Sequence, residues 1–302
     1  MGKQDDNRNR IVVLIDEYLE SLKSRRYSPK SVETYDRAIR DFAAHIGKRD
    51  VRTINRKDLE NYRCALLDRE FKVISIIVYC QAVRLFFRYL EENQIIFENP
   101  AAGLPPLRRT TVLQPVPSEE EMQVLLSRPN SATATGIRDR ALLETLYSTG
   151  LRRQEVLDLK VSSLNLQEGR ARVMGKGQKE RVVPVGKAAL HWLGKYLAEV
   201  RTAWSHDKSG DALWLGSYSG RPLSYEALNQ ILRKYGKGPG IITRIGLHSI
   251  RRACATHMLA RGASPVAIQA LLGHSALKHL SQYLKVTITD LNQAHEKSRV
   301  GE

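Results

Sequence analysis

The stretch LHSIRRACATHMLARGASPVAIQALLGHSALKHLSQYLKV, residues 247 to 286, combines histidines, adjacent arginines and a tyrosine with a helical pattern. Counting 3.6 residues per turn from His248, Arg251 and Arg252 fall on its face of the helix. An arginine guanidinium matches phosphate oxygens with two parallel N–H groups and stays charged at any working pH. We therefore interpret this stretch as the centre of a phosphate-transfer site.

Beyond this helix the same stretch supplies a second imidazole and a phenol. His274 follows Leu272-Gly273 at a predicted turn, and Tyr283 comes nine positions later. The order H-x-x-R, L-G-H and Y at these intervals resembles the C-terminal motif of the tyrosine site-specific recombinases, the lambda-integrase and Xer-like family. One H-x-x-R alone is unspecific, but the three pieces in order are a strong signal. The resemblance implies an enzyme whose tyrosine attacks a DNA phosphate.

The composition indicates a polyanionic partner. Lys and Arg number 48 against 32 Asp and Glu, and the formal net charge is +16. Such a balance suits nucleic acid or an acidic membrane, although a basic protein can lack both. No apolar run approaches the ~18 residues of a membrane span, and the first residues lack a signal peptide. Scattered Cys64, Cys80 and Cys254 predict a reducing compartment. We expect a cytoplasmic, nucleoid-associated protein without a membrane partner.

Helical periodicity without a strand pattern predicts a helical bundle in residues 1–104, and the resemblance makes it a SAM-like, DNA-binding domain. Residues 1–10 are polar and are expected to be mobile, while Ser28 and Pro29 predict a capped start of the second helix. The first expected helix starts at Ile11 and ends in the basic cluster at 23–26. The other expected helices are 29–46, 57–69 and 73–92. Four arginines lie away from the apolar faces and either form a solvated surface or contact DNA: Arg37, Arg40, Arg84 and Arg88.

Residues 105–117 are proline-rich and basic, which is typical of a linker. Ser118 and Glu121 form a capping-box pattern that opens an α+β catalytic domain at residues 118–302. Its one strong β signal is a three-strand meander. The expected strands are 164–166, 170–174 and 181–185, with a short apolar strand at 212–215. The expected helices include 137–148, 187–204 and 225–235. The predicted fold is therefore mainly α with a small antiparallel sheet.

Two further motifs supply an arginine and a lysine. Gly150-Leu151-Arg152 followed by Glu155 resembles the first-arginine motif of the family, which implies a catalytic Arg152 oriented by Glu155 one turn away. An isolated pair at this spacing is more often a surface ion pair. Arg153 is expected at the surface or on the DNA backbone. Lys176 lies at a predicted hairpin turn and matches the lysine of the family; the nearby Lys179 is its rival. A nucleotide-binding loop is not supported, because G-x-x-x-x-G-K-[ST] is absent.

The resemblance thus implies six catalytic residues: Arg152, Lys176, His248, Arg251, His274 and Tyr283. Tyr283 would attack to form a 3′-phosphotyrosyl link, and Arg152 and Arg251 would stabilise the non-bridging oxygens. His274 would add a donor. His248 would bind the phosphate or accept the tyrosyl proton, and Lys176 would protonate the leaving 5′-hydroxyl. A free tyrosine has a pKa near ~10, so the arginines must also lower that of the nucleophile.

No cofactor or metal is expected. No carboxylate cluster suits Mg²⁺. A zinc site formed by His248, Cys254, His257 and His274 fails because the first three do not share one helix face. His257 is expected to be structural.

The resemblance implies a double-stranded DNA recombination site as partner, with a dimer per site and a tetramer in the synapse. Three residues depart from the usual pattern: Arg252 replaces a common second histidine, and Ser281 and Lys285 flank the tyrosine. These departures weaken the assignment of this chain to chromosome-dimer resolution. The integrase of a mobile element is the other role that the sequence allows. A type IB topoisomerase-like enzyme and a catalytically silent DNA-binding protein of the same fold are the alternatives.

Overall fold

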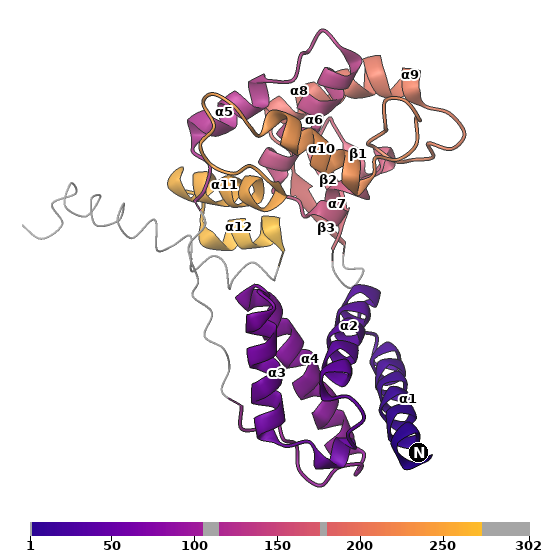
Figure 1. Ribbon diagram of the computed structural model, residues 1–302. Coiled ribbons are helices and arrows are strands. Elements are labelled where there is room, and N and C mark those ends of the chain that lie inside the picture. Colours follow the sequence, from indigo (N-terminus) through magenta and orange to yellow (C-terminus); the bar gives the residue numbers. More distant parts are fainter. Residues whose placement is uncertain (1, 105–114, 176–179, 274–302) are drawn as a thin grey trace, which may run out of the picture. The chain divides into compact units, whose positions relative to one another are not determined.

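The computed structural model describes residues 2–104, 115–175 and 180–273, with side chains from Ile11 onward. These residues form two compact units, Met1–Val112 and Leu113–Glu302 (Figure 1). Three of the predicted catalytic residues, Lys176, His274 and Tyr283, lie outside the described residues, as do Lys179, Ser281 and Lys285. Their assignments therefore stay predictions.

The described part of the first unit is a helical bundle, as predicted (Figure 1). Its helices are α1 (Gly2–Ser24), α2 (Pro29–Ile46), α3 (Arg56–Asp68) and α4 (Val73–Glu92), with a 3₁₀ turn η1 (Val51–Thr53). Helix α2 packs against α1 and α4, and α3 packs against α4. Ser28 caps α2 by accepting from the Ser31 amide at 3.1 Å, with Pro29 in the first turn.

Helix α1 begins at Gly2, so it starts before the apolar face at Ile11 that indicates it in the sequence. Periodicity detects a helix only where one face is apolar, and this polar segment offers no such face. The helical spacing of the apolar residues that follow predicts a buried face formed by Ile11, Leu14, Ile15, Tyr18 and Leu22, and all five are buried. The same kind of spacing predicts that Leu67 of α3 is buried, but it is 48% exposed.

Helix α4 corrects the statement that no apolar run approaches the length of a membrane span. The helix has 20 residues, and an 18-residue window of it has a mean hydropathy of 1.5, so by length and composition alone it meets the criterion. The core helix of a soluble bundle meets the same criterion, since it must be apolar on most of its surface. Its residues Ile76, Phe86, Phe87 and Leu90 are fully buried in the core of the first unit.

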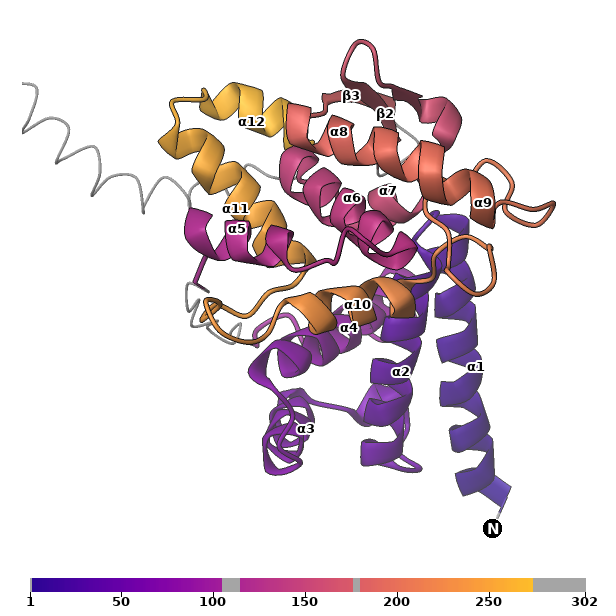
Figure 2. The same ribbon diagram turned by 90° about the horizontal axis from the view of Figure 1, so that it is seen from above.

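The second unit is built around helix α6 (Ala134–Thr149), which packs against four other elements (Figure 2). These are α5 (Glu119–Ser127), α8 (Lys187–Lys195), the π-helical segment η3 (Tyr196–Arg201) and α11 (Leu247–Ala260). The remaining helices are α7 (Arg153–Leu157), η2 (Val161–Ser163), α9 (Thr202–Trp204), α10 (Tyr225–Tyr235) and α12 (Pro265–Leu272). The predicted capping box is present: Ser118 accepts from the Glu121 amide, and Glu121 accepts from the Ser118 amide.

A three-stranded antiparallel sheet completes this unit, in the order β1 (Leu164–Asn165), β2 (Arg170–Met174) and β3 (Glu180–Pro184). Strands β2 and β3 pair Arg172 with Val182 and Met174 with Glu180. The fold class predicted from the sequence, mainly α with a small antiparallel sheet, is therefore confirmed.

The expected strand at 212–215 is not a strand, since only single bridges form there, Lys160 with Ala212 and Leu215 with Pro222. The hydroxyl of Tyr196 takes the place of a partner strand: it donates to the Leu213 carbonyl at 3.0 Å and accepts from the Leu215 amide at 3.1 Å. An apolar run can thus be buried and hydrogen-bonded without a sheet.

A buried polar network joins α6 to α10. Asp139 accepts from the Tyr235 hydroxyl at 2.9 Å and pairs with Arg138, whose Nη1 also donates to the Leu215 carbonyl at 3.1 Å. Buried charges persist only when paired and hydrogen-bonded in this way. The network holds the end of α10, from which the chain continues toward α11 and His248.

Candidate active site

Arg152 is positioned by a sharp turn between α6 and α7. Helix α6 ends at Gly150, whose φ of 58° lies in the left-handed region that glycine adopts without strain. A Cβ at this position would approach the Leu272 Cδ2 atom to 2.6 Å. The turn brings Leu151 into the core and leaves Arg152 at the N-terminal cap position of α7. The glycine is therefore needed both for the turn and for close packing against α12.

The buried carboxylate of Glu155 binds two guanidinium groups, those of Arg152 and Arg181. It accepts from the Arg152 amide at 2.8 Å and from Arg152 Nη1 at 2.9 Å. Arg181 of β3 binds the same carboxylate with both terminal nitrogens, each at 2.9 Å. Burial by itself raises the pKa of Glu155, but the contacts from Arg181 and Arg152 outweigh it and lower the pKa to about 2. Glu155 is thus a carboxylate that orients Arg152.

Arg251 is held by two backbone carbonyls. On helix α11, its Nη1 donates to the Gly150 carbonyl at 2.6 Å and its Nη2 to the Leu272 carbonyl at 2.7 Å. These carbonyls belong to the end of α6 and the end of α12, 101 and 21 positions away in sequence. The guanidinium therefore connects the Arg152 turn to the segment that precedes His274.

One cleft of ≈ 780 Å³ gathers the described catalytic candidates. Arg152, His248 and Arg251 all line it, as do Arg153 and Arg252. His248 is exposed and lies in the first turn of α11. Arg153 was expected at the surface or on DNA; it lines the cleft with its guanidinium 4.1 Å from the ring centre of Tyr225. The concentration of positive charge suits a phosphate group.

The loop that leads into His248 is tied to helix α5. Glu121 accepts from the amides of Ile242 and Thr243 at 2.7 and 2.6 Å. Arg128 donates to the carbonyls of Tyr235 and Pro239, each at 2.6 Å. Burial opposes ionisation of Glu121, yet these amides and its own cap contact lower its pKa to about 2. Two side chains from another element thus order a glycine-rich loop.

His257 has the structural role expected from the sequence. It is buried, and its Nδ1 lies 2.8 Å from the Tyr147 hydroxyl, with the two rings in edge contact. Burial lowers the pKa of His257 and so favours the neutral imidazole. Cys254, one turn earlier, is also buried, and burial raises the pKa of its thiol to about 12. Within the described ranges no cluster of three or more metal-binding side chains occurs.

Arg181 is the site residue that the sequence analysis missed. It was treated as one position of a β-strand, yet its side chain is only 17% exposed. The available signal was the period-2 pattern: Arg181 lies on the same face of β3 as Val183, which is fully buried. An arginine on the buried face of a strand needs a partner, and here the partner is Glu155.

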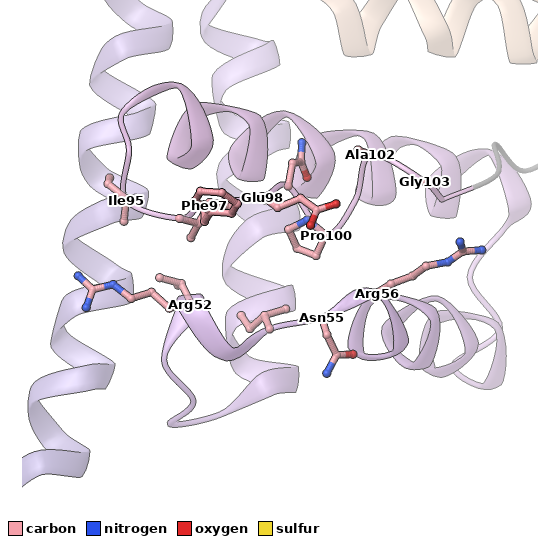
Figure 3. Close-up of a pocket in the computed structure, with 13 residues that line it drawn as sticks. Arg52, Asn55, Arg56, Ile95, Phe97, Glu98, Pro100, Ala102 and Gly103 are labelled. Carbon is pink, nitrogen blue, oxygen red and sulfur yellow. The ribbon is translucent and has the colours of Figure 1, made fainter.

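The first unit has a separate hollow of ≈ 630 Å³ between η1, the start of α3 and residues 95–103 (Figure 3). Arg52, Arg56 and the fully exposed Phe97 line it. Arg56 is paired with Glu60 at 2.9 Å. Glu98 is the one acidic residue among those that line the hollow, and no Ser, Thr, Cys, Tyr or His lines it, so we assign no chemistry to it.

Replacing Glu155 by glutamine should make stability less dependent on pH. Because the pKa of Glu155 is lowered from 4.5 to about 2 in the folded protein, its stabilising contribution is present above the unfolded pKa and disappears as pH falls toward 2. A pKa shift of this size corresponds to a contribution of about 3 kcal/mol to the free energy of unfolding at neutral pH. Urea unfolding from pH 7 down to pH 2 should show Glu155→Gln less stable at neutral pH and similar to wild type at the acid end.

The matched control is Glu168→Gln, since Glu168 is 58% exposed and contacts Arg170 at 3.4 Å. Exposed ion pairs contribute only ~0–1 kcal/mol, so this variant should follow the wild-type curve. A constant difference between Glu155→Gln and wild type at every pH would show that the charge of Glu155 is not what stabilises the fold.

Two family models match this chain and together cover most of it. The phage integrase family matches residues 116–289, and the N-terminal SAM-like domain of phage integrases matches residues 14–96. The chain therefore belongs to the phage integrase family and is a tyrosine site-specific recombinase of the lambda-integrase and Xer type.

Its relatives include the tyrosine recombinase XerD of Pseudomonas aeruginosa, 32% identical over 292 residues that cover 94% of this chain and 96% of the relative. XerD of Listeria monocytogenes serotype 4b is 30% identical over 289 residues, 94% of this chain and 97% of the relative.

Solved structures share the fold. XerH recombinase bound to a palindromic difH substrate has a TM-score of 0.71 at 20% identity, covering 95% of this chain and 83% of that one. A lambda integrase dimer bound to a COC′ core site has a TM-score of 0.69 at 18% identity, covering 87% of this chain and 94% of that one.

Proposed function

We propose that this protein cuts and rejoins duplex DNA at a specific site through a 3′-phosphotyrosyl intermediate on Tyr283. The observation that carries the proposal is the arrangement of Arg152 and Arg251 at one cleft. Arg152 is oriented by the neighbouring Glu155, and Arg251 by carbonyls from distant parts of the chain. Two oriented guanidiniums match the two non-bridging oxygens of a phosphodiester. The assignment of Tyr283 as the nucleophile rests on its match to the motif of the tyrosine recombinase family.

In the proposed reaction the phenol oxygen of Tyr283 attacks phosphorus, and the bond to the 5′-oxygen breaks. Lys176 gives its proton to that oxygen, so that a neutral 5′-hydroxyl leaves. His274 adds a hydrogen bond to the phosphate, and His248 either binds the phosphate or takes the phenolic proton. The phosphotyrosyl bond retains the energy of the phosphodiester, so a 5′-hydroxyl can reverse the step without ATP, metal or cofactor.

We further propose residues 1–104 as a DNA-binding domain, 105–117 as a linker and 118–302 as the catalytic domain. The contacts of the arginines in the first domain support different roles for them. Arg37 pairs with Glu33, and Arg40 pairs with both Asp16 and Asp36, which favours a solvated charged face for these two. Arg84 donates to the Leu104 carbonyl at 2.7 Å. Arg88 is exposed and is the better candidate for a phosphate contact.

The proposed partner is a double-stranded recombination site, bound by a dimer and joined with a second site in a tetramer. Support comes from lambda integrase, whose structures include a dimer on a COC′ core site and a tetramer on a Holliday junction. A basic, nucleoid-associated cytoplasmic enzyme fits the net charge of +16. The XerD relatives favour recombination over the topoisomerase and silent-binder alternatives. Chromosomal resolution and mobile-element integration both fit this scheme.

The test is capture of the covalent intermediate from a pool of DNA sites. The wild-type protein is mixed with a library of nicked duplexes of randomised sequence, in which the short strand beyond the cut diffuses away and prevents rejoining. We expect SDS-stable protein–DNA adducts. The DNA sequenced from them should converge on one motif, and the protein should be joined to the 3′-phosphate at the cut. Binding that enriches a motif while yielding no adduct would contradict the enzyme and support a silent DNA-binding protein.

A further inference from the structure

We infer that Arg181 is a positioning residue of the active site: it orients Arg152 through Glu155 and holds the end of helix α12. The inference rests on the proposed function and assigns to that site a residue outside the recombinase motif. Arg181 lies on β3, 26 positions from Glu155 and 90 from Leu271, so no local pattern brings these groups together.

Each of the three guanidinium nitrogens of Arg181 donates to the protein. Nη1 and Nη2 bind Glu155 Oε1 and Oε2, both at 2.9 Å, in a bidentate pair. Nε donates to the Leu271 carbonyl at 3.1 Å. Three of its five N–H groups thus bind the protein, which places Arg181 to act through these neighbours.

The bidentate pair fixes the carboxylate that orients Arg152. Both oxygens of Glu155 contact Arg181, while the same oxygens accept from the side chain and the amide of Arg152. A carboxylate held by two parallel N–H groups cannot rotate about its last bond without losing one of them. The orientation of Arg152 at the cleft therefore depends on Arg181.

The hydrogen bond from Arg181 Nε also fixes the position of the end of α12. Arg181 binds the Leu271 carbonyl, and Arg251 binds the carbonyl of the next residue, Leu272. Gly273 follows with a φ of 80°, and a Cβ there would lie 3.4 Å from Arg152 Nη1 and 3.6 Å from Arg181 Cζ. The chain thus ends α12 directly against the two guanidiniums, and Arg181 helps to set where it leaves the helix.

The experiment compares Arg181→Gln and Arg181→Lys with wild type in single-turnover cleavage of the nicked duplex recovered by adduct capture. Removing a partner that orients a reacting group typically costs ~10–100-fold in activity, and we expect a loss of this size for Arg181→Gln with little change in DNA binding. Lysine offers a single ammonium group in place of the planar guanidinium fork. The cleavage rate of Arg181→Lys should therefore lie between those of wild type and Arg181→Gln. Arg170→Gln is the matched control, because Arg170 is an exposed arginine of the neighbouring strand.

A second substrate separates positioning from a general loss of structure. In a methylphosphonate duplex a methyl group replaces one non-bridging oxygen at the cut, so the phosphate carries no negative charge. Cleavage then depends less on the charge placed by Arg152, and the ratio of wild-type to Arg181→Gln rates should shrink toward one on at least one diastereomer. A variant that is merely less folded loses the same factor on both substrates.

Two outcomes would overturn the inference: Arg181→Gln cleaving at the wild-type rate, or an equal loss on the phosphate and methylphosphonate duplexes. Failure of the wild-type protein itself to form an adduct would contradict the proposed function instead. Thermal unfolding of each variant measures the fraction folded, and rates are compared per folded molecule.

Discussion

A Tyr283→Phe variant should bind its DNA site with wild-type affinity and form no covalent adduct. Phenylalanine keeps the ring and removes only the oxygen, so the attacking atom is lost while packing is preserved. The arginines of the proposed site cannot replace it, because they remain protonated and serve the phosphate oxygens. The expected effect is therefore complete loss of the phosphotyrosyl product.

The measurement is an SDS gel of protein incubated with the nicked duplex, next to a binding assay on the same DNA. Tyr218→Phe is the matched control, since Tyr218 is fully exposed and lies outside the cleft. An adduct formed by Tyr283→Phe would show that a different residue is the nucleophile. Loss of the adduct in Tyr218→Phe would show that the assay reports something other than chemistry.

Replacing Lys176 by alanine should slow cleavage by ~10²–10⁴, the range typical of a positioned general acid. A 5′-alkoxide is a poor leaving group and needs a proton as its bond to phosphorus breaks. A 5′-thiolate leaves without one, so a duplex with sulfur at the bridging 5′ position should restore the rate of Lys176→Ala to near that of wild type. The two substrates are compared in single-turnover reactions.

Lys179→Ala is the natural control, because Lys179 lies three positions away, directly after the same predicted turn. It should cleave the ordinary duplex at close to the wild-type rate. Equal slowing of Lys176→Ala on both substrates would exclude Lys176 as the general acid. A sulfur-rescued defect in Lys179→Ala would transfer the role to that residue.

Local signals in the sequence were reliable wherever a few neighbouring residues carried the information. The Ser28 cap, the Ser118–Glu121 capping box and the buried face of α1 depend on spacings of three or four residues. The same holds for the pair of Arg152 and Glu155. Each is a helix-surface relation, which the chain specifies before it folds.

Errors arose where burial and backbone bonding were decided by partners far away. The apolar run at 212–215 has the composition of a strand, but no ladder forms: the Tyr196 hydroxyl satisfies two of its backbone groups, and isolated backbone contacts to Leu159 and Leu223 satisfy others. The polar start of α1 carries no periodic signal, so the sequence did not indicate a helix there. Periodicity reports which face is buried, so it is silent about helix that extends beyond the core.

The sequence by itself determined the family, the fold class and the order of the chemical groups, because motif spacing and periodicity are properties of the chain. Only the tertiary structure decided how the guanidiniums are held. Arg181 reaches Glu155 from another strand, and Arg251 reaches carbonyls at the ends of two helices. The physical reason is that a buried charge must find partners wherever packing places them, and packing joins residues that sequence separates.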